Sequence, residues 1–469
     1  MRAALILAAF LALAACAVGP RYSKPPTVAA SPNWVEAAST TAVDPGWWRS
    51  LGDPVLSELV QAAIERNLDV RVAQAQVREA RANRAAAFGS RLPQVNATGS
   101  ANRNELSENG EFPINSIPGF KRRFNLFEAD FDASWEIDFW GRNARSVEAA
   151  DARVASASEA LHNVQLETVA EVVRTYVDLR SAQARLASAA QDAQAQTQTA
   201  ALVSERYQAG EASRLDEARA QAQASSTSSA LAGLSADAHG AAYRLALITA
   251  RPPEGLAALA EQPASLPAIP PTAGAGMRSD LLRRRPDVRQ AERDLAAATA
   301  DVGVATADLF PRVTLKASAG QQSRSTANFL SGSSSLYQFG PSLSWPIFSA
   351  GSIRAQIRAA GARGDEAAAR YEKAVVSALA DSETALNRYA AAGAQRRDRD
   401  AARAQSALAL DLAQQRYAQG EDDLVTLLDA QSTYSSAEQS ALLAQANELT
   451  ALVSLYKALG GGWQAAEAR

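Results

Sequence analysis

Apolar and polar side chains alternate without a break over residues 127–139, which read FEADFDASWEIDF. The apolar side chains occupy the odd positions, and the residues between them are polar or acidic. Neighbouring side chains of a strand point to opposite faces, so this period of two predicts a strand with one apolar and one polar face. The pattern alone is equally typical of a soluble sheet that buries its apolar face on a core.

The same period recurs in three other segments of the chain. We expect strands at about 94–102, 126–139, 312–320 and 335–348, with the first two paired. The apolar side of the last strand is formed by Tyr337, Phe339, Leu343, Trp345 and Ile347. A long polar loop at 103–123 joins the first pair, and transmembrane barrels carry their long loops outside the cell. This loop is therefore expected to face the exterior.

Beyond Gly141 the pattern becomes helical. Residues 142–209 contain neither glycine nor proline and are rich in alanine, glutamine, glutamate and arginine. At about 1.5 Å per residue, such a helix is roughly 100 Å long, several times longer than an ordinary globular helix. Asp53 and Pro54 predict the start of an earlier helix that continues to about Phe88. Residues 281–309 predict another helix.

The second half of the chain repeats the first at an offset of 210 positions. Trp345, Ile347 and Gly351 repeat Trp135, Ile137 and Gly141. The segments RYQAGEAS and RYAQGEDD repeat in the same way, with the matching residues Arg206, Tyr207, Gly210, Arg416, Tyr417 and Gly420. A glycine that adopts a left-handed conformation ends a helix there. The repeat predicts a tandem duplication of strands and long helical hairpins, over 142–250 and 352–459.

These elements divide the chain into six regions. We expect a signal peptide at 1–15, an extended amino-terminal arm at 16–52, a first repeat at 53–250, a linker at 251–277, a second repeat at 278–462 and a tail at 463–469. The linker holds six prolines in 251–276, which predicts an ordered belt without regular helix.

The first residues resemble an export signal. Arg2 precedes an apolar run that is too short for a membrane-spanning helix. The junction from Leu13 to Cys16 resembles a bacterial lipobox, which predicts that Cys16 becomes the lipidated first residue of the mature protein. An ordinary signal peptide with an incidental cysteine is the alternative. Cys16 is the only cysteine, so an intramolecular disulfide is impossible.

Four strands leave two open edges, and unpaired backbone groups have no partner in lipid. A barrel therefore has to be shared between chains, and three copies would supply twelve strands. Apolar residues at helical spacing, Leu166, Val169, Val173 and Tyr176, predict a seam that packs against partner helices. If the apolar sheet face meets lipid, the polar face lines a lumen. That lumen would be formed by Glu128, Asp130, Asp132, Glu136, Asp138, Arg312 and Lys316.

Other classes of function find little support in the sequence. Net charge is −3, with 47 basic and 50 acidic residues, which gives no electrostatic case for nucleic-acid binding. His162 and His239 stand alone without clustered ligands, so we predict no metal site. No phosphate-binding loop or set of nucleophile, base and orienting group is evident, so we predict neither a cofactor nor an enzyme. A lipid-anchored periplasmic coiled-coil scaffold remains the alternative from another class.

Several stretches resemble the outer membrane factor family, in its TolC-like, NodT-type lipoprotein branch. They are CAVGPRYSKPP at Cys16, WWRSLGDPVLSELV at Trp47, LLRRRPDVRQAERDLAAATADVGVATADLFPRVTL at Leu281, RYAQGEDDLVTLLDAQ at Arg416 and LYKALGGGW at Leu455. The resemblance implies a homotrimer with a twelve-stranded outer membrane barrel and a twelve-helix periplasmic tunnel. It also implies a passive exit duct that serves an inner-membrane RND-type transporter through a periplasmic adaptor docked at the hairpin tips. A type I protein-secretion duct is the runner-up.

A tunnel from the periplasm to the outside would leak if it were always open, so we expect a gate near the tips. The resemblance implies a latch at this gate, in which Tyr417 bonds Asp216 and holds the tunnel closed. In a trimer, inward-facing Asp422, Asp423 and Asp429 would each become a ring of three carboxylates. Asp422 and Asp429 lie two helical turns apart and share a face, whereas Asp423 is rotated by about 100°. The simpler alternative for these acids is that they complement a helix start. Asp422 also stands where some relatives carry a basic latch residue. The sequence does not name a cargo.

Overall fold

A computed structural model describes residues 17–24, 33–36, 39, 41–107 and 121–464 of the chain. The chain forms two compact units, each assembled from separate stretches. The first combines Arg78–Ser156 and Ala291–Arg370 with the described part of 1–25, and the second combines Ala157–Gln290 and Tyr371–Arg469 with Pro26–Val77.

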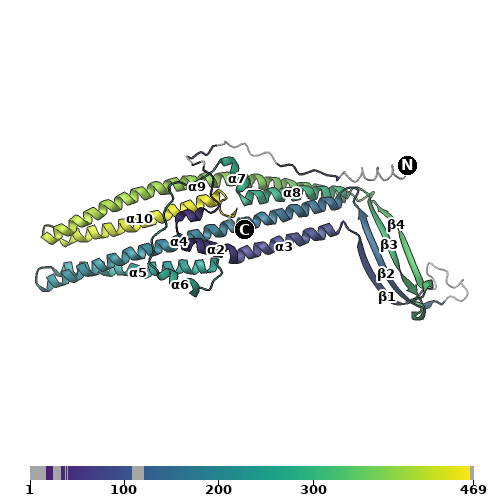
Figure 1. The fold of residues 1–469 in the computed structure, drawn as a ribbon, viewed down its shortest axis with the longest axis horizontal. Coiled ribbons are helices and arrows are strands. Elements are labelled where there is room, and N and C mark those ends of the chain that lie inside the picture. The colour runs from purple at the N-terminus through teal and green to yellow at the C-terminus, as the bar shows by residue number, and fades with distance from the viewer. Residues whose placement is uncertain (1–16, 25–32, 37–38, 40, 108–120, 465–469) are drawn as a thin grey trace. The chain divides into compact units, whose positions relative to one another are not determined.

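The first unit contains a four-stranded antiparallel sheet in the order β1-β2-β3-β4 (Figure 1). Its strands are β1 (Gln94–Glu105), β2 (Arg123–Ile137), β3 (Arg312–Ser323) and β4 (Ser335–Ser344). All four predicted strands are therefore present, and the predicted pairing of the first two is confirmed. Three of the strands run past the expected ends on the loop side.

The strand register places the apolar residues of all four strands on one face. Phe131 lies opposite Ala97 and Ala319, and Ala319 in turn lies opposite Tyr337. Residues directly opposite each other in a sheet share a face. This face is uncovered in the single chain, since Tyr337 is 80% exposed and Phe131 is 65% exposed.

Two strands end earlier than the alternation predicts. β2 ends at Ile137 and β4 ends at Ser344. Pro346 lacks the backbone N–H that would extend the ladder, so Trp345 and Ile347 lie beyond β4. The Trp345 indole N–H instead donates to the Leu309 carbonyl at 3.1 Å. The prediction of a strand to 348 was therefore wrong at its end.

The first predicted helix is two helices, α2 (Pro54–Arg66) and α3 (Leu68–Gly89). The backbone is extended at Asn67, whose amide oxygen accepts the N–H groups of Asp69 at 2.8 Å and Val70 at 3.1 Å. This capping restarts the helix with a new phase. At the start of α3, Leu68 is 53% exposed, whereas Val70 is buried.

The two long hairpins form as predicted (Figure 1). They are α4 (Arg142–Gln208) with α5 (Arg214–Ile248), and α9 (Ser352–Gln419) with α10 (Leu424–Ala458). The duplication extends to single backbone conformations: φ is 74° at Gly141 and 83° at Gly351, and 79° at Gly210 and 78° at Gly420. The tandem duplication is thereby confirmed at the level of individual turns.

The prediction that the linker contains no regular helix is wrong, and the start of the second repeat is divided into two helices. A helix α6 (Glu254–Glu261) lies inside the proline-rich stretch, between its prolines. The expected helix at 281–309 is α7 (Arg278–Arg284) followed by α8 (Pro286–Ala307), because Pro286 disfavours helical geometry at Arg285. Single turns of 3-10 helix occur at η1 (Trp47–Leu51), η3 (Thr326–Asn328) and η4 (Gly332–Ser334).

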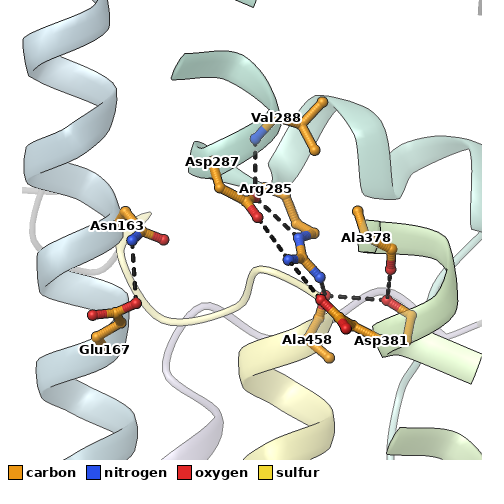
Figure 2. A network of polar contacts seen from close by, with 9 residues as sticks. Asn163, Glu167, Arg285, Asp287, Val288, Ala378, Asp381 and Ala458 are labelled. Atoms are coloured by element: carbon orange, nitrogen blue, oxygen red, sulfur yellow. Dashed lines mark hydrogen bonds and ion pairs between the residues drawn. The ribbon is translucent and has the colours of Figure 1, made fainter. Parts of the chain in front are cut away.

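A polar network holds α7 and α8 to the hairpin helices within the second unit (Figure 2). The Arg285 guanidinium donates to Asp287 at 2.7 and 3.0 Å, to Asp381 at 3.3 Å and to the carbonyl oxygen of Ala458 at 3.1 Å. Arg285 therefore links the start of α8 to α9 and α10.

The apolar core of the second unit gathers around η1. Trp47 is 1% exposed, stacks on Tyr456 at a centroid distance of 4.8 Å and donates its indole N–H to the Gly461 carbonyl at 3.3 Å. The predicted seam of α4 is also buried here, with Val173 and Tyr176 fully covered by the chain itself. The Tyr176 hydroxyl donates to the carboxylate of Asp53, so the start of α2 helps to cover this seam.

Candidate functional site

The two hairpin tips have the same backbone geometry. At the first, the N–H of Glu211 bonds the carbonyl of Arg206 at 2.8 Å and the N–H of Gly210 bonds that of Tyr207 at 3.0 Å. At the second, Glu421 and Gly420 make the equivalent bonds at 3.0 and 3.1 Å. This pair of bonds is the Schellman motif, which requires a left-handed residue that glycine adopts without strain.

The tips pack together through a small apolar cluster in the second unit. Ala200 and Val203 of α4, Ala220 of α5 and Leu424 of α10 are buried in it. Tyr417, from the end of α9, is half-buried against the same cluster. The two hairpins of one chain therefore meet at their ends, which brings several predicted site residues within reach of one another.

Tyr417 bonds the first hairpin through Arg206 rather than Asp216. The Arg206 guanidinium donates to the Tyr417 hydroxyl at 3.3 Å and lies 5.2 Å from the ring centroid, a cation–π arrangement. Asp216 is engaged elsewhere, because it forms a capping box with Ser213, whose hydroxyl lies 2.6 Å from its carboxylate. The Tyr417–Asp216 bond implied by the family resemblance is thus replaced in this structure by a contact from Arg206.

The three acids after the second tip have different surroundings. Arg416 binds the Asp422 carboxylate through two hydrogen bonds, at 2.7 and 3.0 Å. Asp423 is the N-cap of α10 and accepts the Thr426 N–H at 2.9 Å. Asp429 is exposed, and no side-chain partner is found for it among the described residues. Helix capping, the simpler alternative, therefore applies to Asp423, while Asp422 belongs to an ion pair.

The carboxyl groups of Asp422 and Asp423 both have lowered pKa values. Hydrogen bonding from Arg416 lowers the pKa of Asp422 below its ordinary 3.8, and the N–H and hydroxyl of Thr426 lower that of Asp423. A carboxylate whose folded-state pKa is depressed contributes stability above its unfolded pKa and loses it as the pH falls through the folded pKa. Both groups are therefore charged throughout the neutral range.

Above the tips, polar side chains of α4 bond those of α10, a contact set that the sequence analysis missed. Arg185 donates to Gln439 at 3.0 Å, Ser435 donates to Asp192 at 2.7 Å and Gln431 donates to Thr199 at 3.3 Å. The α4 members recur every seven residues, which places them on one face of the helix. That spacing is the signal that could have identified them.

The polar face of the sheet gathers the predicted lumen residues of the first unit. Glu128 accepts hydrogen bonds from Ser100 at 3.2 Å and from Gln322 at 2.6 Å. The register places Asp130, Asp132 and Glu136 on this same face, together with Lys316, which lies opposite Ser134. A side chain at Gly320 would overlap the Asp130 carboxylate, so the glycine makes room for the acid.

Two predicted lumen residues are engaged at the strand ends. Asp138 follows the end of β2, and its carboxylate accepts the N–H of Ala144 at 2.7 Å, at the start of α4. Arg312 begins β3 and pairs with Asp308 at 2.6 Å. Asp138 therefore lies beyond β2 and serves the junction between the sheet and the helices, which corrects its placement on the strand. Arg312 remains in β3, on the same face as Lys316, and bonds toward the same junction.

The histidines have structural surroundings. His162 stacks on Trp463 at a centroid distance of 4.4 Å and contacts Glu159 at 3.1 Å, and His239 lies against Tyr243. Within 41–107 and 121–464, and in the short described segments before them, no three acidic, histidine or cysteine residues converge as metal ligands. Cys16, the predicted lipidation site, lies outside the described residues.

Of the helices that the structure describes, none combines the length and apolar character needed to cross a bilayer.

Comparison with known proteins places this geometry among outer membrane proteins. Residues 59–251 and 277–461 match the family model described as outer membrane efflux protein. The chain is 33% identical over 418 residues to the pyoverdine export outer membrane protein OpmQ of Pseudomonas aeruginosa, a match that covers 89% of this chain and 87% of the relative. It is 29% identical over 458 residues to nodulation protein T of Rhizobium leguminosarum bv. trifolii, with 97% and 96% covered.

A solved structure agrees with these matches. The outer-membrane channel OprN superposes with a TM-score of 0.87 and 35% identity, over 96% of this chain and all of that one. The four strands and duplicated helical hairpins are thus the fold of an outer membrane channel. Because the family model covers both repeats, the chain belongs to the outer membrane efflux protein family and is the outer membrane exit duct of an efflux pump.

Proposed function

We propose that three copies of this chain assemble into a passive outer membrane duct for small molecules. The observation that carries the proposal is the two-faced sheet, which leaves Tyr337 and Phe131 exposed on one side and a row of acids on the other. An apolar face suits lipid and an acidic face suits a water-filled lumen. Among the residues that the structure describes, no further strand pairs with the outer edges of β1 and β4, and pairing between three copies would close a twelve-stranded barrel.

The partners that we propose are a periplasmic adaptor and an inner-membrane RND-type transporter. Each tip lies at the end of a helix of about 67 residues, which is roughly 100 Å long. The two repeats have the same turn at their tips, so an adaptor would meet two equivalent turns on each chain. The energy would come from the transporter, and the duct itself would carry out no catalysis. OpmQ is named for export of pyoverdine, and this favours a small molecule over a secreted protein as the cargo class.

Conductance of the purified protein in a planar bilayer tests the duct directly. A trimeric pore gives discrete current steps, whereas a lipid-anchored scaffold with a soluble sheet gives none. Cross-linking before insertion reports whether the conducting species is a trimer. If a correctly folded preparation gives no current steps, the proposal of a duct is wrong.

Lipid anchoring through Cys16 is a separate part of the proposal. We expect the mature protein to begin at an acylated Cys16, tethered to the outer membrane, as the Leu13 to Cys16 junction indicates. Intact-mass measurement of the membrane-extracted protein checks this. A first residue other than Cys16, or an unmodified cysteine, contradicts it.

The tip glycines provide a test of adaptor docking. Replacing Gly420 or Gly210 by valine puts a β-branched side chain at φ near 78°, which costs about 1 kcal/mol or more per turn. We expect trimers that insert normally, with weaker adaptor cross-linking and weaker efflux. Gly332, in an exposed loop without close neighbours, is the matched control. Unchanged cross-linking in both tip variants would count against docking at this surface.

The contact between Arg206 and Tyr417 is expected to restrain a gate at the tips. Arg206→Gln combined with Tyr417→Phe removes a hydrogen bond and a cation–π contact, a loss of about 1 kcal/mol per chain. Single-channel conductance and sensitivity to large antibiotics should rise. Asp216→Ala, which affects only the capping box, should leave the conductance near that of wild type. If Asp216→Ala raised the conductance and the double variant did not, the latch would be the Tyr417–Asp216 bond.

A ring of Asp422 carboxylates is expected to favour cations. Asp422→Asn should lower cation preference and weaken block by multivalent cations. Since pairing with Arg416 depresses the pKa of Asp422, the preference should stay constant from pH 8 to pH 5 and decline only below the ordinary value of 3.8. Reversal potentials measured across this pH range report the cation preference. A cation preference that changed near pH 6 would exclude Asp422 as its origin.

A further inference from the structure

Basic residues gather at the loop end of the sheet, at the end of β1 and the start of β2. They are Arg103, Lys121, Arg122 and Arg123, with Glu105 as the acid among them. We propose that this cluster, here called the basic rim, binds the phosphate groups of lipid headgroups in the outer leaflet of the outer membrane. The inference rests on the proposed function, which places this sheet in the membrane with its loops outside.

The register places two arginines of the basic rim on the apolar face. Arg103 lies opposite Asn125 and Glu105 lies opposite Arg123, so these four side chains share one face. Phe127 and Phe131 continue that face along β2. The face that would meet acyl chains therefore changes from apolar to basic within a few residues of the strand end.

The height of the basic rim matches the membrane. Arg123 and Trp135 occur on the same strand and the same face. At about 3.3 Å per residue they lie roughly 40 Å apart along the strand, which a tilt of about 40° reduces to roughly 30 Å along the membrane normal. The hydrocarbon core of a bilayer is also about 30 Å thick. With Trp135 at one interface, Arg123 reaches the headgroups of the other.

The described residues compensate the charge of Arg103 and Arg123 only in part. Glu105 pairs with Arg123 at 2.9 Å and with Arg122. Arg103 and Lys121 are exposed, and no ion pair is found for either among the described residues. Arg123 also keeps 69% of its side chain exposed while paired. Among the described residues of the apolar face at this end, one carboxylate, Glu105, thus stands beside two arginines, Arg103 and Arg123, which leaves positive charge on the lipid side.

The geometry also suits a phosphate. Arg103 and Arg123 are diagonal neighbours across the β1–β2 pair, with Cβ atoms about 7 Å apart. A phosphate between them can accept hydrogen bonds from both guanidinium groups, which are suited to bidentate contact with its oxygens. The apolar surface that begins at Phe127 accommodates acyl chains attached to the same molecule. A phosphorylated lipid satisfies both surfaces at once, whereas an inorganic anion satisfies only the first.

The experiment measures binding of defined lipids to the full-length protein in detergent, by native mass spectrometry and by the shift in thermal unfolding temperature. The probes are lipid A with both phosphates, the same lipid A without phosphates and inorganic phosphate. The test variant is Arg103→Gln with Arg123→Gln. Arg324→Gln is the matched control, because the Arg324 guanidinium lies 4.5 Å from the Phe124 ring, at the same end of the sheet but on the polar side.

Wild type and the Arg324 variant should bind phosphorylated lipid A about a hundredfold more tightly than the double variant does, because each of the two lost charged hydrogen-bond donors contributes about tenfold. Removal of the phosphates should lower wild-type binding to the level of the double variant, and inorganic phosphate should not compete. Equal binding of both forms of lipid A, or wild-type binding by the double variant, overturns the proposal. Competition by inorganic phosphate would show a simple anion site.

Conductance keeps this test separate from that of the duct. Channels in a bilayer without selective lipid binding would refute the basic rim alone, whereas absence of channels would refute the duct. Circular dichroism and trimer cross-linking of the double variant exclude misfolding as the cause of lost binding.

Discussion

Substitution of Phe131 by arginine is expected to abolish assembly of the conducting channel. Phe131 lies near the middle of β2, is 65% exposed in the single chain and belongs to the apolar face of the sheet. An arginine near the bilayer midplane costs about 2–4 kcal/mol on the lipid side of a transmembrane barrel, and a trimer would carry this cost three times. The measurement is the yield of heat-resistant trimer in the outer membrane fraction, together with bilayer conductance.

The next residue supplies the control. Asp132 lies on the polar face, opposite Asn96 and Ser318, so Asp132→Arg introduces the same side chain one position away into the expected lumen. That variant should assemble and conduct, with weaker cation preference. If both variants assemble equally well, or if only Asp132→Arg fails to assemble, the apolar face does not meet lipid. That result would favour the alternative of a soluble sheet.

Replacement of Trp47 by alanine should produce the largest loss of stability in the second unit. Trp47 is 1% exposed, its ring stacks on Tyr456 and packs edge-on against Trp48 at a centroid distance of 6.0 Å, and its indole bonds Gly461. Truncation of a buried tryptophan to alanine costs about 3–5 kcal/mol, because a cavity remains where the ring was. The apparent unfolding temperature of the detergent-solubilised protein should fall accordingly.

Trp47→Phe separates packing from hydrogen bonding. Phenylalanine keeps an aromatic ring against Tyr456 and loses the indole N–H, so its cost should be well below that of alanine, at about 1–2 kcal/mol. A loss below about 1 kcal/mol for Trp47→Ala would show that the arm does not contribute to this core. The result matters for function because η1 joins the amino-terminal arm to the end of α10.

At the hairpin tips, the local sequence pattern predicted the turns but not the contact between the two hairpins. Gly210 and Gly420 were predicted as left-handed turns because only a few residues decide a Schellman motif, and the structure has both. The partner of Tyr417 was not predictable in the same way. Capping by Ser213 occupies Asp216, and the packing of the two hairpins brings Arg206 to the hydroxyl instead.

The amino-acid sequence by itself determined the faces of the sheet, the long helices, their reversal points and the duplication. Each of these depends on periodicity or on a single glycine, which act over a few neighbouring residues. The tertiary structure decided that Tyr417 contacts Arg206, that Arg185 and Asp192 of α4 bond α10, and that Arg285 bonds the carbonyl of Ala458. These outcomes depend on which polar groups come within about 3 Å of one another, and that distance is set only when separate segments of the chain pack together.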